Sequence, residues 1–146
     1  MNLLSKYLDQ TPERRRLLIE AGWQLLRARL LLRWIPFRRL ADKLNRPGSG
    51  AELQGKQRVQ VREEVAWAIQ RVADHLPGKT VCFPRAIAAH SMLYRRGVFT
   101  TLYYGAGSNS QGSLIAHVWV QDGAVGVVGM PEPYTFRVVA RYPEVV

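Results

Sequence analysis

Helical periodicity dominates the first half of the chain. From Pro12 to Trp34, apolar residues return every three or four positions and arginines fill much of the rest, so one face is apolar and the other basic. Thr11-Pro12-Glu13 is typical of a helix start, because the threonine hydroxyl can cap free backbone N–H groups and proline suits the first turn. The pattern predicts a helix over 12–34, ending before Pro36, and further helices over about 37–44 and 56–75.

The pattern changes after Pro77. Pro84 near a first turn and Gly97 as a left-handed cap delimit a predicted helix from Cys82 to about Arg96. Beyond it, aromatic and β-branched residues predict strands over 99–104, 114–121, 124–128 and 134–141, with a Gly/Ser loop over 105–112 and a two-residue hairpin turn at Asp122-Gly123. Helices followed by antiparallel strands indicate an α+β fold, in which N-terminal helices precede a cysteine-bearing helix packed on a small antiparallel sheet.

Length and charge refine this organisation. A chain of 146 residues, 47% of them hydrophobic, is expected to form one domain over 1–146. We divide it into a basic helical subregion, 1–50, and a helix-plus-sheet core, 51–146, that would carry any catalytic site. Residues 1–60 hold 13 Lys and Arg against 5 Asp and Glu, so most of the formal charge of +10 lies in the N-terminal half and predicts an anionic partner or surface.

The cysteine content and the apolar runs exclude several classes of protein. One cysteine permits neither an internal disulfide nor a cysteine-based zinc site, and it suits a reducing cytoplasm. No apolar run has the length of a signal peptide or of a membrane-spanning helix. No phosphate-binding or dinucleotide motif is present, so we expect no cofactor and no metal.

Cys82 and His117 are the candidate chemical residues. Cys82 begins a predicted helix, where unpaired backbone N–H groups favour a negative charge on sulfur, as a nucleophile requires. His117 lies on a predicted strand, and packing of that helix on the sheet would bring the imidazole to the thiol as a general base. The alternatives are that Cys82 is a small buried hydrophobe and that His117 is an ordinary strand residue.

Other residues are weaker candidates. His90 lies too far along the Cys82 helix, about 12 Å at 1.5 Å per residue, and His75 would need a flexible turn to position it. For a third group that orients the imidazole, Asp122 is expected to be a turn residue more than about 15 Å from His117. Counting across the predicted turn places Val128 opposite His117, which makes Glu132 the nearest carboxylate, although it can also be a solvated loop acid.

Four short segments carry a resemblance to a known family. They are Cys82-Phe83-Pro84-Arg85-Ala86, Leu93-Tyr94-Arg95-Arg96-Gly97, Leu102-Tyr103-Tyr104-Gly105 and Ala116-His117-Val118-Trp119-Val120. With these segments in this order, residues 80–142 resemble the leader peptidases of lasso peptide biosynthesis, which are cysteine proteases of the transglutaminase-like superfamily. The helical N-terminal half and the total length are similar to the stand-alone protease subunit.

The resemblance implies an activity and partners. Cys82 would be the nucleophile and His117 its base in removing the leader from a ribosomally made precursor peptide. The implied partners are that precursor, a separate leader-recognition protein and an ATP-using macrolactam synthetase. The family usually carries an acid twelve or thirteen residues after the histidine, where this chain has Gly129 and Met130. Either Glu132 substitutes, or another group orients His117, or the enzyme is slow without help.

Two other function classes remain open at this point. The missing acid is compatible with a catalytically silent transglutaminase-like adaptor that holds a leader or a partner. The basic N-terminal half is also compatible with a small nucleic-acid-binding protein or with a helix at a membrane surface, although no nucleic-acid-binding motif is present. Our leading prediction is the peptidase, with no nucleic acid among its partners.

Overall fold

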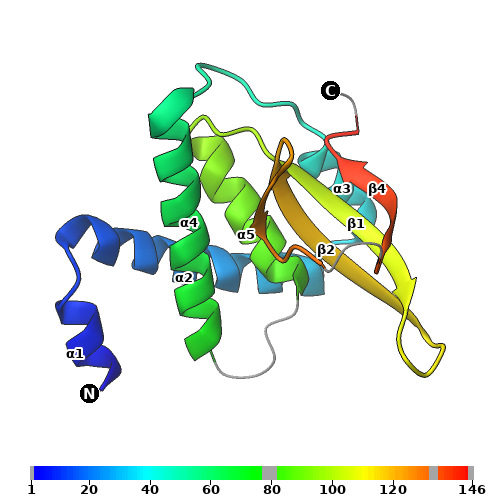
Figure 1. Cartoon of the computed structure of the whole chain (residues 1–146), viewed down its shortest axis with the longest axis horizontal. Helices are drawn as coiled ribbons and strands as arrows, with labels where there is room; N and C mark the ends of the chain where they lie inside the picture. Colours follow the sequence, from blue (N-terminus) through cyan, green and yellow to red (C-terminus); the bar gives the residue numbers. More distant parts are fainter. Residues whose placement is uncertain (1, 77–81, 132–134, 145–146) are drawn as a thin grey trace.

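Helices precede an antiparallel sheet along the chain, as Figure 1 shows. The computed structural model describes residues 2–76, 82–131 and 135–144. Within these residues the elements are α1 (Leu3–Leu8), α2 (Pro12–Trp34), α3 (Phe37–Leu44), α4 (Gly55–His75), α5 (Cys82–Arg95), β1 (Thr101–Ser108), β2 (Leu114–Asp122), β3 (Val125–Val128) and β4 (Arg137–Tyr142). The sheet order is β3-β2-β1-β4, and each neighbouring pair is antiparallel. The predicted α+β fold is confirmed.

Local capping explains where the N-terminal helices begin and end. The Thr11 hydroxyl accepts the backbone N–H of Arg14 at 3.2 Å, with Pro12 as the first helical residue of α2. Pro36 follows α2 and precedes α3, because its fixed φ and missing N–H end one helix and suit the start of the next. The predicted bounds of both helices are confirmed, whereas the short α1, capped by Asn2, was not predicted.

Helix α5 forms the centre of the core. It packs on α2 and α4 on one side and on the sheet, chiefly β2, on the other (Figure 1). Small side chains of α2 and α5, such as Ala21, Ala28 and Ala89, are fully buried and let the helix backbones approach closely. Gly97, at φ +80°, ends α5 in the predicted left-handed cap, with the Val98 N–H donating to the Leu93 carbonyl at 2.9 Å.

Strand β1 is longer than predicted and starts later. It continues through Gly105 and Gly107, where the sequence predicted a loop, because these glycines pair with β2 and lie beneath aromatic rings. A Cβ on Gly105 would lie 2.7 Å from Cζ3 of Trp119 and 2.9 Å from Cβ of Phe136. The glycines therefore make room for large side chains on the sheet.

The hairpin register also differs from the prediction. The turn is Gly123–Ala124, one residue later, and Asp122 pairs with Val125 as the last residue of β2. A shift between Val120 and Gln121 then places Val128 opposite Val120, so the prediction that Val128 faces His117 is wrong. Gly123 at φ +61° supplies the left-handed conformation that the turn needs. Residue 134 of the last predicted strand lies outside the described residues.

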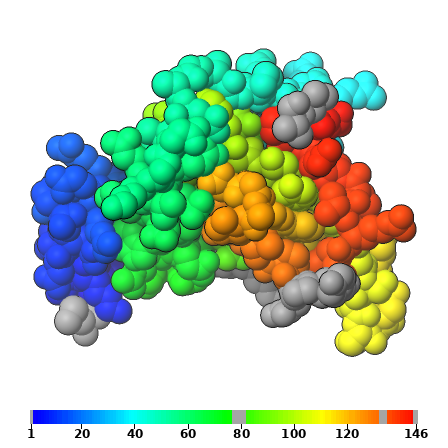
Figure 2. Space-filling model, turned by 45° about the horizontal axis from the view of Figure 1, so that its top comes forward, coloured from blue at the N-terminus to red at the C-terminus, as the bar shows by residue number. Residues whose placement is uncertain are grey.

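The outer face of α2 is not purely basic. Its side chains at helical spacing include large apolar groups that are about half exposed or more, which we call the α2 outer stripe: Ile19, Trp23, Leu26, Leu30 and Trp34. Figure 2 shows α1 and the first turns of α2, in blue, at one side of the molecule beside α4. Within the described residues, no helix is long and apolar enough to cross a bilayer.

Candidate active site

Cys82 is the first residue of α5 and is half-buried. Pro84, fully buried in the first turn, fixes the start of the helix, since proline needs no N–H partner there. The backbone N–H groups of a first turn have no partner within the helix, so this end of α5 can stabilise negative charge on sulfur or on a nearby carbonyl oxygen. The chemistry available to Cys82 is that of a nucleophile at a helix N-terminus.

His117 lies on β2 and is held by a backbone carbonyl. Its Nε2 is 2.5 Å from the oxygen of Gly129, just after β3. A carbonyl only accepts, so Nε2 carries the proton in the neutral ring and Nδ1 is the nitrogen free to take one up. The ring is also flanked by Phe136, with centroids 5.1 Å apart, and by Trp119 at 5.9 Å. These contacts fix the position and tautomer of the imidazole.

Gly129 stands at one of the two positions where the resemblance led us to expect a carboxylate. Its φ of +72° turns the chain after β3, and its carbonyl makes the contact to His117 that an acid would otherwise make. The sequence could not identify this partner, because a backbone carbonyl leaves no side-chain signal. Glu132, the predicted substitute, lies outside the described residues.

The structure places Cys82 and His117 on packed elements without joining them. Val118 and Val120 of β2 belong to the core beneath α5, and alternation along the strand directs His117 to the opposite face, with Trp119. Within residues 2–76, 82–131 and 135–144, no hydrogen bond or ring contact joins the thiol to the imidazole. Because His117 lies on the face of β2 opposite to α5, a reacting pair requires one of the two side chains to reach the face of the sheet that carries the other.

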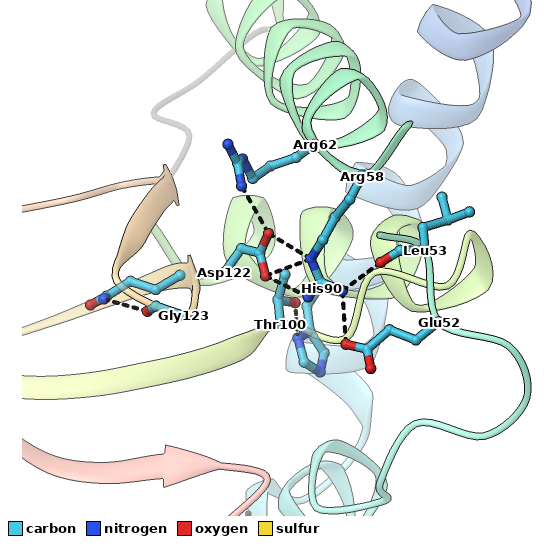
Figure 3. A network of polar contacts seen from close by, with 9 residues as sticks. Glu52, Leu53, Arg58, Arg62, His90, Thr100, Asp122 and Gly123 are labelled. Carbon is cyan, nitrogen blue, oxygen red and sulfur yellow. Dashed lines mark hydrogen bonds and ion pairs between the residues drawn. The ribbon is translucent and has the colours of Figure 1, made fainter. Parts of the chain in front are cut away.

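Asp122 has a structural role that the sequence did not reveal. It is only 8% exposed, and its carboxylate accepts from Arg58 Nη2 at 2.5 Å and from Arg62 Nη1 at 2.9 Å (Figure 3). The arginine hydrogen bonds hold the pKa of Asp122 below its usual range, and the same contact raises the pKa of Arg58. The network ties the end of β2 to the start of α4, so Asp122 is not the turn residue that we predicted.

The remaining histidines lie away from this chemistry. His90 is buried in α5, where its Nδ1 is 2.8 Å from the Thr100 hydroxyl, and burial lowers its pKa to about 4. His75 is exposed at the end of α4, with Nδ1 2.7 Å from the Arg71 carbonyl oxygen. Within the described residues, no three His, Cys, Asp or Glu side chains gather as a metal site would require.

The fold and these residues define a class of protein. Cys82 lies at the N-terminus of a helix that packs on an antiparallel sheet, and His117 lies on the strand that this helix contacts. Proteins that use a cysteine thiol as a nucleophile carry a cysteine and a histidine on such elements.

Comparison with family models identifies the family. A transglutaminase-like superfamily model matches residues 22–141, most of the chain, and the protein belongs to this superfamily, in which cysteine proteases and transferases are common. Searches of curated proteins and of solved structures found no match.

Proposed function

We propose that this protein is a cysteine peptidase that removes the leader from a lasso peptide precursor in the cytoplasm before macrolactam closure. The observation that carries the proposal is the start of α5 at Cys82, on a helix that packs against the strand bearing His117. Membership of the transglutaminase-like superfamily supports cysteine chemistry at these positions. The four segments that resemble the leader peptidases support the choice of substrate.

The proposed reaction uses His117 as base and then as acid. Nδ1 takes the Cys82 proton, and the sulfur attacks the scissile carbonyl carbon. The carbon–nitrogen bond then breaks, and Nδ1 returns the proton to the leaving amine. Water hydrolyses the thioester to release the leader with a free carboxylate. The N–H groups at the start of α5 stabilise the transient oxyanion. We propose that binding of the substrate or of a partner brings Cys82 and His117 together.

The deciding experiment is cleavage of a lasso peptide precursor that carries its leader, with a leader-recognition protein present. Wild type is expected to release the leader, while Cys82→Ala and His117→Ala each reduce the rate by at least about 1,000-fold. His75→Ala is the matched control, because His75 is exposed at the end of α4 and, within the described part of the chain, makes no hydrogen bond or ring contact with Cys82 or His117. Cleavage undiminished in Cys82→Ala ends the proposed mechanism.

An adaptor without catalysis is the second candidate, favoured by the absence of a contact between Cys82 and His117. Iodoacetamide separates the two functions, since Cys82 is the only cysteine in the chain and any alkylation reports on it alone. A peptidase is expected to react much faster than glutathione at pH 7. An adaptor is expected to react no faster, and to bind the leader without cleaving it.

The proposal includes the three partners of this reaction: the precursor, the recognition protein and the ATP-using macrolactam synthetase. The α2 outer stripe is flanked by Arg16, Arg27 and Arg33, so it offers an acidic partner both apolar area and positive charge. We assign this face to the recognition protein. Reversing the charge of Arg27 and Arg33 is expected to weaken that association at low salt, and an unchanged affinity would remove the assignment.

A further inference from the structure

An aromatic cavity has Phe83, the residue that follows Cys82, in its lining. It has a volume of about 320 Å³ and lies where the starts of α3 and α5 meet β1 and β4. Its lining consists of Phe37, Phe83, Tyr104, Val139, Ala140 and Tyr142. An apolar cavity of about 150 Å³ is enough to hold benzene, so this one has room for a large apolar side chain.

The rings form a loose cluster. Phe83 lies edge-on to Phe37, with centroids 5.9 Å apart, and is tilted on Tyr104 at 6.1 Å. Phe37 also meets the edge of Tyr142 at 6.3 Å. Edge-to-face and tilted rings attract one another, and they present both faces and edges to a further apolar group. The cluster is therefore suited to receiving another aromatic or branched aliphatic side chain.

The mouth of the cavity is open to solvent. Phe37 is 45% exposed and Val139 is 57% exposed, which leaves apolar area uncovered. No lining residue carries a charge, and the polar groups are limited to two tyrosine hydroxyls and the backbone. A charged side chain would lose its hydration here without gaining a partner, so the lining selects for apolar groups.

The position of the cavity suggests its occupant. Phe83 directly follows Cys82, and adjacent Cα atoms are about 3.8 Å apart, so the cavity lies within reach of a polypeptide that has its carbonyl carbon at the thiol. We propose that the cavity binds a large apolar side chain, aliphatic or aromatic, of the substrate close to the bond that Cys82 attacks. This inference rests on the proposed function and names the substrate class of the same site.

The test uses alkylation of Cys82, which requires no peptidase activity. Wild type is treated with iodoacetamide and, separately, with N-(2-phenylethyl)iodoacetamide. In both reactions the sulfur displaces iodide from the CH₂ group, giving a thioether and releasing the thiol proton to solvent. For the protein and for glutathione, the rate constant with N-(2-phenylethyl)iodoacetamide is divided by the rate constant with iodoacetamide. The ratio for the protein, divided by the ratio for glutathione, is the preference of the protein for the aromatic group. We expect a preference of about 10-fold.

Two variants alter the cavity and one serves as a matched control. Val139→Glu places a charge at the mouth, and Phe37→Ala removes a wall; both positions are well exposed, so the fold is expected to persist. In both variants, the ratio of the two rate constants should fall to within 2-fold of the ratio for glutathione. Val138→Glu makes the same change at the preceding residue of β4, which is 47% exposed and does not line the cavity. This control variant should retain the preference.

The outcomes distinguish this inference from the proposed function. A wild-type ratio equal to that of glutathione, or equal ratios in Val139→Glu and Val138→Glu, overturns the inference. Alkylation with the expected preference but no cleavage of any precursor rejects the peptidase and leaves the cavity as a binding site. Where cleavage is found, replacing the large apolar residues nearest the scissile bond by alanine should lower kcat/KM about 10-fold at one position, and Val139→Glu should abolish that difference.

Discussion

Replacing Asp122 by asparagine removes the negative charge that two arginines of α4 share at the end of β2. The carboxylate side chain is 7% exposed, and the side chains of Arg58 and Arg62 are each 16% exposed. Removing one partner of a buried ion pair costs about 3–5 kcal/mol, because the other charges stay buried. Asparagine keeps one acceptor oxygen, and Arg58 keeps Glu52 at 2.7 Å, so we expect a loss of about 2–3 kcal/mol.

This loss converts into a measurable change in melting temperature. An unfolding entropy of about 2.1 cal/mol/K per residue gives about 0.3 kcal/mol/K for 146 residues. Asp122→Asn is therefore expected to lower Tm by about 7–10 °C at pH 7 in calorimetry. The matched control is Asp74→Asn, since Asp74 is exposed on α4 and, among the residues that the structure describes, its side chain accepts only from Gln70, four residues earlier. The control should shift Tm by less than about 2 °C.

The pH dependence provides a second check on the same charge. The arginines lower the pKa of Asp122 in the folded state. The contribution of Asp122 to the free energy of unfolding is therefore complete above its pKa in the unfolded chain, near 4, and is lost as the pH falls through its lower pKa in the folded state. The difference in free energy of unfolding between wild type and Asp122→Asn should be constant from pH 5 to 7 and should become smaller below about pH 4. A difference under 0.5 kcal/mol at pH 7 would refute the reasoning.

Two further predictions concern His90 and Gly105. Burial lowers the pKa of His90 to about 4, so the unfolded chain binds a proton that the folded chain does not. The free energy of unfolding should fall by about 3 kcal/mol from pH 6.5 to pH 4, and urea titrations of His90→Gln should lack this slope; an unchanged slope contradicts the assignment. Gly105→Ala would press a methyl group on Trp119 and lower the free energy of unfolding by about 1–3 kcal/mol. Because His117 stacks on Trp119, the NMR signals of His117 should also shift. Unchanged stability and signals would show that the contact relaxes freely.

Signals close together in the sequence predicted the helices well. The Thr11 cap, Pro36 and Gly97 each act within one helical turn, so they fix the ends of α2, α3 and α5 wherever the helices pack. The α+β class followed from the order of these elements. Cys82 was likewise placed at the start of its helix, because Pro84 is a local signal.

Long-range contacts decided what the sequence could not predict. The two glycines of β1 form a strand rather than a loop, because Trp119 and Phe136 cover them. The turn after β2 moved by one residue, because Arg58 and Arg62, some 60 residues earlier, hold Asp122 in the strand. Neither effect is visible in a window of neighbouring residues. The contact of His117 with the Gly129 carbonyl is of the same kind, since it depends on the hairpin register.

The replacement of a carboxylate by the Gly129 carbonyl has a consequence for the proposed catalysis. A carbonyl oxygen fixes the tautomer and orientation of His117, but it carries no full charge to stabilise the imidazolium that forms when Nδ1 takes a proton. In the proposed reaction, more of the rate would therefore have to come from positioning the substrate. Under this proposal the cavity lined by Phe83 would supply one such contact, and the α2 outer stripe would supply a surface for a partner that presents the leader. Cleavage by this protein is accordingly expected to depend more strongly on the recognition protein than cleavage by a relative that carries the acid.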